Sequence, residues 1–120
     1  MEHYLKNLEY TAVLPLAGQV DYLSGQVVSK TLVQNGSLGL TLFAFDKGEE
    51  ISTHVSTGDA LVQVLDGTGE VSIDSKKYVL HAGECIVMPA RHPHAVYAPE
   101  RFKMLLIVVF PGKKDMPEKR

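Results

Sequence analysis

The sequence lacks several features that would place it in a common functional class. Its 120 residues contain a single cysteine, so no disulfide can form within the chain, as is usual in a reducing compartment. Cys85 lies in the apolar run "CIVM" with no base nearby in sequence, so we expect a small buried side chain rather than a catalytic thiol. There is also no tryptophan, and without that residue and a cysteine pair the chain lacks the usual core of an immunoglobulin domain.

Concentrated positive charge and targeting signals are missing as well. The 12 Lys and Arg residues are scattered among 14 Asp and Glu residues, giving a net charge of -2 and no basic stripe. The N-terminus "MEHYLKNLEY" has no basic region followed by an apolar stretch, and no apolar run approaches the roughly 18 residues of a membrane span. We therefore expect one cytoplasmic domain with a sizeable core and with neither a nucleic-acid nor a membrane partner.

Helical periodicity is absent from the whole chain. Short runs rich in Val, Ile, Leu, Thr and Phe alternate with turn sequences such as "QNGS", "STGD", "DGTGE" and "HAGE". This spacing predicts an all-β fold whose antiparallel strands close into a jelly roll or small barrel. The predicted strands cover residues 25–33, 38–45, 59–65, 70–73, 77–80, 84–88, 94–98 and 102–110.

Composition divides the chain into a barrel and two flanking segments. Residues 1–24 are expected to form a strand or a short helical turn, residues 25–112 the barrel, and residues 113–120 a charged tail. The runs 59–65 and 102–110 are apolar at nearly every position, so both of their faces must be covered. A second copy of the chain would cover the exposed face of these strands, which predicts a homodimer. Alternatively, the chain's own N-terminal segment covers that face, or this segment is itself part of the dimer contact.

The stretch "GEEISTHVSTGDALVQVLDG" carries the first recognisable motif. Its glycines and histidine follow the pattern G-x5-H-x-H-x3-E-x6-G, with Gly48, His54 and Gly67 in place. Two positions depart from that pattern, because Ser56 stands in place of the second histidine and Ala60 in place of the glutamate.

A second motif, G-x5-P-x-G-x2-H-x3-N, begins at Gly83. Pro89 and His94 match it, whereas Arg91 replaces its glycine and Ala98 its asparagine. Together the two motifs span residues 48–98 and resemble those of the small single-domain cupins. The resemblance implies a cupin-type double-stranded β-helix, which is an antiparallel jelly-roll barrel.

The resemblance also implies where a metal would be held. In cupins with complete motifs, the histidines and glutamate of the first motif and the histidine of the second bind a divalent ion, and of these only His54 and His94 remain. His92 is a third candidate because residues two apart in an extended strand point to the same side, although Pro93 makes its direction uncertain. One divalent transition metal (iron, manganese, nickel, copper or zinc) and no metal at all both stay open.

The residues predict a pocket inside the barrel. Ser56 and Ala60 enlarge and neutralise the space that the lost ligands would occupy, and Met88 is placed by parity among the apolar walls. Parity alone does not decide whether Phe43 and Phe45, or Leu42 and Ala44, face inward. The predicted pocket residues are His54, Ser56, Ala60, Met88 and His94.

Three functions fit such a pocket. The first hypothesis is a barrel that binds a small organic molecule around a degenerate metal site. The second is a metal-dependent enzyme of the dioxygenase or isomerase type that uses His54 and His94, with or without His92. The third is a purely structural dimerisation module. A metal site needs imidazole nitrogens that converge on one point, a binding module needs an open cavity, and a structural module needs a barrel filled with side chains.

Overall fold

The computed structural model describes residues 2–112, and it is built almost entirely from strands. A short 3₁₀ helix, η1 (Leu16–Gln19), precedes them. The strands are β1 (Val27–Gln34), β2 (Leu38–Phe45), β3 (Glu50–His54), β4 (Asp59–Ile73), β5 (Lys76–His81), β6 (Cys85–Met88), β7 (His94–Tyr97) and β8 (Phe102–Val109). The all-β prediction is therefore confirmed. Within residues 2–112, no helix is long and apolar enough to cross a membrane.

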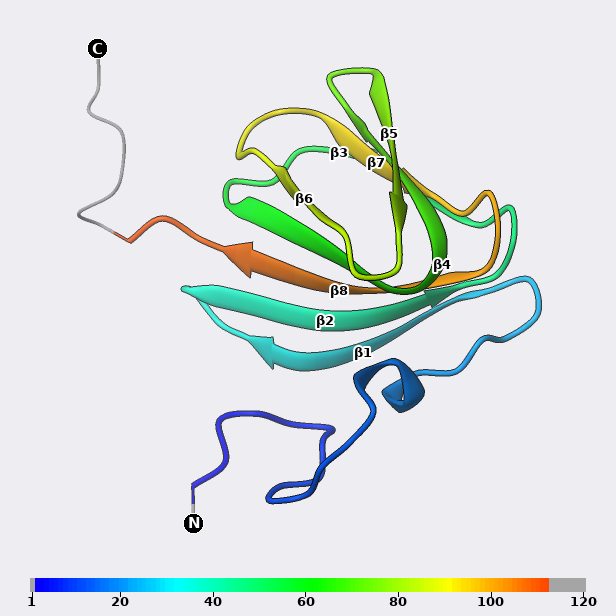
Figure 1. The fold of residues 1–120 in the computed structure, drawn as a ribbon. Helices are drawn as coiled ribbons and strands as arrows, with labels where there is room; N and C mark the ends of the chain where they lie inside the picture. The colour runs from blue at the N-terminus through cyan, green and yellow to red at the C-terminus, as the bar shows by residue number, and fades with distance from the viewer. Residues whose placement is uncertain (1, 113–120) are drawn as a thin grey trace.

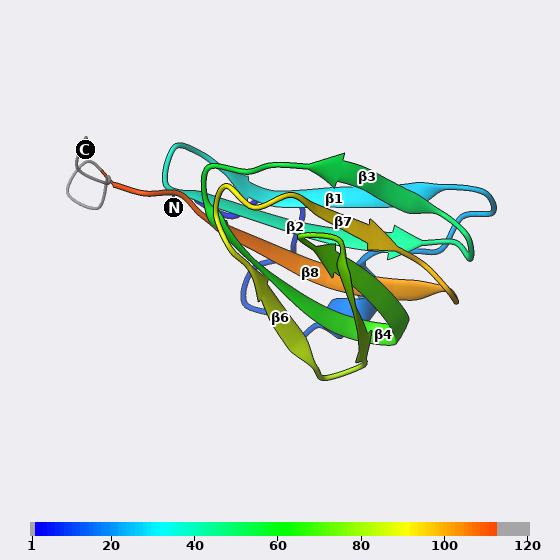
Figure 2. The same cartoon turned by 90° about the horizontal axis from the view of Figure 1, so that it is seen from above.

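All of the strand pairs are antiparallel, and they form two facing sheets that share one strand. The first sheet has the order β1-β2-β8-β4, with β6 on the other side of β4. The second sheet contains β3, β7, the second half of β4, and β5. Figure 1 shows the two sheets curled toward each other, with β3 and β7 on one side and β1, β2 and β8 on the other, and in the view from above (Figure 2) β3 and β7 overlie the first sheet. This arrangement is the predicted jelly roll.

Strand β4 differs from the prediction of two separate strands joined by a turn at "DGTGE". It runs unbroken from Asp59 to Ile73 and passes from the first sheet into the second, with a register shift between Val64 and Asp66. Gly67 has a φ of 74°, and a Cβ atom there would lie 2.0 Å from the Arg101 carbonyl oxygen. The glycines therefore bend the strand around a corner rather than end it.

Strand β3 was not among the predicted strands. Its burial alternates poorly, since Ile51 is the one residue of the five that is partly buried and the others are exposed. It is held by pairing with β7, in which Glu50 lies opposite Tyr97 and His54 opposite His94. An edge strand of this kind lacks the apolar period that sequence analysis detects.

The core occupies the space between the sheets, and a second cluster lies outside them. Phe45 and Phe43 face inward, and the Phe45 ring stacks on Phe102 with 4.5 Å between ring centroids. Leu42 and Ala44 face outward, where they are fully buried with Val20. The structure thus shows which alternate residues of β2 face into the barrel, a choice that the sequence left open.

The N-terminal segment covers this outer cluster. Figure 1 shows it on the side of β1 and β2 away from β3 and β7. Two lysines of the sheet fix η1 through its carbonyl oxygens, since Lys103 Nζ donates to Ala17 at 2.6 Å and Lys30 Nζ to Gln19 at 3.1 Å. Part of the apolar outer face is therefore covered by the chain itself.

The prediction that Cys85 is buried is wrong. Cys85 is exposed, as is Val87, whereas Met88 is buried and Ile86 packs against the core. Residues of the four-residue strand β6 alternate between the two faces, and Cys85 has the outward parity. An apolar run of this length does not reveal that only every second residue is inside.

Candidate functional site

A cavity of about 550 Å³ lies between the two sheets. The second sheet contributes His54, His94 and Val96 to its wall, and the first sheet contributes Ala60 and Met88. The remaining lining residues are Phe43, Ile51, Val55, Ser56, Thr57, Met104, Leu106, Val108 and Phe110. Every residue that the sequence predicted for the pocket lies in this wall, although their role in binding stays a prediction.

Register across the strands explains how these side chains meet. His54 and His94 are direct partners in the β3–β7 ladder, so their side chains leave the sheet on the same face. In the first sheet Ala60 is paired with Met88 on one side and with Val108 on the other, which places all three in one row beneath the histidines. The site is therefore a polar pair facing an apolar row.

The two imidazole rings contact each other directly. Their Nε2 atoms are 3.0 Å apart, and the rings meet edge to face with 4.2 Å between centroids and an interplanar angle of 79°. His94 is 2% exposed, whereas His54, at the end of β3, is exposed. The pair thus links the interior of the barrel to its surface.

The hydrogen bond of His54 to the backbone assigns the tautomers of the two rings when both are uncharged. Nδ1 of His54 lies 2.9 Å from the Ser52 carbonyl oxygen, which can only accept, so this nitrogen carries the proton. Nε2 of His54 is then an acceptor, and Nε2 of His94 donates to it. Nδ1 of His94 is buried, and within residues 2–112 it makes no hydrogen bond of good geometry. Such an atom costs about 1–3 kcal/mol unless water or a ligand satisfies it.

Burial keeps His94 neutral. Desolvation lowers the pKa of His94 below its ordinary value of 6.5, and the charge that His54 can carry lowers it further. The backbone carbonyl of His92 has the opposite, weaker effect. The centre of the cavity therefore favours uncharged imidazole.

The comparisons with known proteins agree with this geometry. The sequence profile of the cupin domain matches residues 41–110, which include both motifs. The chain belongs to the cupin family. None of the curated proteins matches it significantly.

Solved structures place this cupin near two bacterial relatives. A conserved protein of unknown function from Streptococcus pyogenes is 48% identical, with a TM-score of 0.91 over 92% of this cupin and 97% of that chain. A cupin superfamily protein from Desulfitobacterium hafniense is 35% identical, with a TM-score of 0.84 over 88% and 97% of the two chains. Salicylate 1,2-dioxygenase from Pseudoaminobacter salicylatoxidans is 20% identical, with a TM-score of 0.65 over 77% of this cupin and 27% of that enzyme, which shows the fold alone.

The metal site that complete cupin motifs imply is only partly matched by the donors of this chain. Two imidazole nitrogens about 2.1 Å from one ion and at a right angle would be about 3.0 Å apart, and the two Nε2 atoms have this separation. However, no three His, Cys, Asp or Glu side chains come together as a metal site anywhere in residues 2–112. Because catalytic sites normally use three protein ligands, the donor set fits a permanently bound ion poorly.

His92 does not complete that set. Its Nδ1 lies 2.7 Å from Asp74 Oδ2, and both side chains are about half exposed. The residue is absent from the cavity wall, because the turn before Pro93 sends it outward while His94 begins the inward face of β7. The structure therefore does not bring His92 together with His54 and His94.

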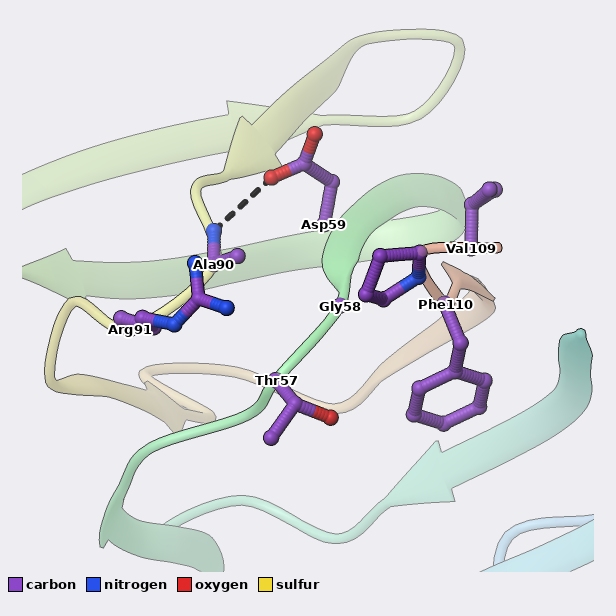
Figure 3. A pocket seen from close by; sticks show the side chains of 8 residues that line it. Thr57, Gly58, Asp59, Ala90, Arg91, Val109 and Phe110 are labelled. Carbon is purple, nitrogen blue, oxygen red and sulfur yellow. Dashed lines mark hydrogen bonds between the residues drawn. The ribbon is translucent and has the colours of Figure 1, made fainter. Parts of the chain in front are cut away.

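A smaller pocket, of about 300 Å³, adjoins the cavity. Figure 3 shows Thr57, Gly58, Asp59 and Arg91 around it, with Phe110 below Val109. Thr57 and Phe110 line both spaces. Sequence analysis missed this pocket because it is formed by loop residues and by the end of β8, which share no periodic pattern.

Proposed function

We propose that this cupin binds a small, partly apolar organic molecule in its barrel, with His54 and His94 as the polar centre and no permanently bound metal. The observation that carries the proposal is the cavity of about 550 Å³, which falls within the usual range for small-molecule sites. A purely structural module would fill this space with side chains. The apolar row and the buried imidazole of His94, whose pKa is lowered, favour an uncharged or partly apolar body at this depth.

The departures from the complete motif support the same conclusion. Ala60 is 2% exposed and lines the cavity, so the position at which the motif has a glutamate here presents a methyl group. The Ser56 hydroxyl accepts a hydrogen bond from the Gly58 amide at 3.1 Å, which commits it to shaping the loop. Both changes remove donors that an ion would need and leave room for a ligand.

The test is to measure metal and ligand binding on the same preparations. Untagged protein purified without chelators is expected to contain less than stoichiometric metal by elemental analysis, before and after incubation with iron, manganese, nickel, copper or zinc. In NMR titrations with neutral probes such as benzamide and hexanamide, the methyl groups of Ala60, Met88 and Met104 are expected to shift. Ala60→Val, which adds two methyl groups to the wall, should weaken these probes.

Two outcomes would contradict the proposal. Near-stoichiometric metal that disappears in His54→Ala and in His94→Ala, but is retained in the matched control His92→Ala, would favour a metal-dependent enzyme. The 3.0 Å separation of the Nε2 atoms makes this the second candidate function. If no probe shifted the cavity methyl groups at any concentration, the binding function itself would be contradicted.

A further inference from the structure

Arg91 has an unusual backbone conformation at the rim of the barrel. Its φ is 66°, in the left-handed region, and its amide donates to the Ser56 carbonyl oxygen at 2.8 Å. The complete cupin motif has glycine at this position, and glycine adopts such a φ without strain, whereas another residue pays roughly 1–2 kcal/mol. A costly conformation that is firmly held suggests that the side chain serves a purpose.

The surrounding contacts fix where the arginine side chain begins. On one side Arg91 is tied to Ser56, a residue of the cavity wall. On the other side the amide of Ala90 donates to Asp59 Oδ1 at 2.8 Å, which anchors the turn to the start of β4. The turn therefore presents Arg91 at the small pocket that adjoins the cavity (Figure 3).

Within the described part of the chain, the guanidinium group of Arg91 has no charged partner. Arg91 takes part in none of the ion pairs found within residues 2–112, unlike Arg101, which lies 2.8 Å from Asp46. Among residues 2–112, Asp59 is the one carboxylate that lines the same pocket, and it is turned to the Ala90 amide (Figure 3). An exposed arginine beside an apolar cavity provides the planar, multiple donors that suit a carboxylate.

We propose that the ligand of this cupin is an organic acid, whose carboxylate is bound by Arg91 in the small pocket while its apolar body occupies the barrel. The inference rests on the proposed function, and it specifies the chemical class of the ligand. Thr57 and Phe110, which line both spaces, mark the passage between the two parts of the molecule. The buried imidazole of His94 inside the barrel and the cation at the rim then give the ligand one orientation.

The test compares each acid with its own neutral amide. Hexanoate and hexanamide, and benzoate and benzamide, are titrated by NMR against the full chain and against Arg91→Gly and Arg91→Lys. The wild type is expected to bind the acids about tenfold more tightly than the amides, since a charge-assisted hydrogen bond contributes roughly that much. Arg91→Gly should abolish this preference, and Arg91→Lys should retain part of it.

Thermal unfolding separates this role from a structural one. Arg91→Gly relieves the backbone strain, so its Tm is expected to equal or exceed that of the wild type while acid binding falls. Lys47→Gln is the matched control, because Lys47 is an exposed cation paired with Glu100, near the end of β8 that is remote from Arg91. It should keep the wild-type ratio of acid to amide binding.

The failures of the two proposals are distinguishable. The role of Arg91 is overturned, and the binding function stands, if the wild type binds acids and amides with equal dissociation constants. The same conclusion follows if Arg91→Gly leaves the preference for acids unchanged. If neither acids nor amides bind, both proposals are overturned.

Discussion

Two imidazole rings are joined by a hydrogen bond at the centre of this cupin, and burial restricts the protonation of one of them, His94. His94 donates through Nε2 to His54 and is 2% exposed. A positive charge on this ring would lose its water shell and face a second imidazole. The folded protein therefore prefers the neutral form, which couples the protonation of one side chain to the stability of the barrel.

This coupling gives a pH dependence with a definite sign. Because the pKa of His94 is lowered on folding, the unfolded chain binds this proton more readily than the folded protein does. The stability that the neutral ring contributes to the folded protein is therefore full above the ordinary pKa of 6.5, and it is lost as the pH falls through the folded pKa. Tm measured from pH 8 down to pH 5 should fall more steeply for the wild type than for His94→Gln. The control is His81→Gln, at an exposed histidine. Equal slopes in the wild type and His94→Gln would contradict the assignment.

At the residue scale, the spacing of a motif was enough to predict which side chains lie together, while their role in binding stays a prediction. His54, Ser56, Ala60 and His94 were assigned to one pocket from the motif positions, and the structure brings them together. The direction of His92 depended on the turn before Pro93, which parity cannot predict. Arg91 could have been found from one signal, namely a bulky residue where the motif requires glycine.

Among the elements, β4 determines the shape of the barrel. Its first half pairs with β8 and β6 and its second half with β7 and β5, so one bent strand joins the two walls of the cavity. The bend depends on the absence of side chains at its corner. Gly67 lies against the Arg101 carbonyl group, and a Cβ atom at Gly69 would lie 2.7 Å from the Phe102 ring.

Substitution at the corner is therefore expected to be costly. Gly67→Ala combines a positive φ with a clash against backbone, and it should lower the free energy of unfolding by about 3 kcal/mol or more. Gly36→Ala is the matched control, because no atom lies within 4 Å of the added Cβ position; its effect should stay within about 0.5 kcal/mol. Urea unfolding of both variants measures the difference. Comparable stabilities would show that the bend does not need Gly67.

The strands illustrate which elements a sequence reveals. Runs with buried residues on at least one face, such as those that became β2 and β8, were predicted nearly to the residue. The exposed edge strand β3 has no such pattern, because its pairing with β7 rather than burial holds it in place. The "DGTGE" segment has the composition of a turn, and only the contact between Gly67 and Arg101 explains why the ladder continues through it.

For the molecule as a whole, the outer face of the first sheet is the main unexplained surface. Val87, Leu61 and Ile107 lie side by side on β6, β4 and β8, with Leu40 next in the row on β2. The N-terminal segment packs over Leu40 and Leu105, whereas Val87 remains 51% exposed. A continuous apolar row of which the chain covers only one end is the kind of surface that a second copy would bury.

The predicted homodimer follows from this row. Sedimentation analysis should give about twice the chain mass of 13.2 kDa, and Val87→Lys should shift the protein toward the monomer without lowering its β-sheet content by circular dichroism. Val79→Lys is the matched control, since Val79 on β5 is 58% exposed and lies away from the row. A wild-type mass of one chain at high concentration would contradict the prediction.

The position of β8 in the first sheet has a consequence for how the protein emerges from the ribosome. β8 lies between β2 and β4, yet it is the last of the eight strands to be synthesised. Until its residues leave the exit tunnel, β2 and the first half of β4 each present an unpaired edge, and the cavity lacks the part of its wall that β8 contributes. Closure of the barrel must therefore wait until residue 109 has left the exit tunnel, and until then the nascent chain carries exposed apolar strands.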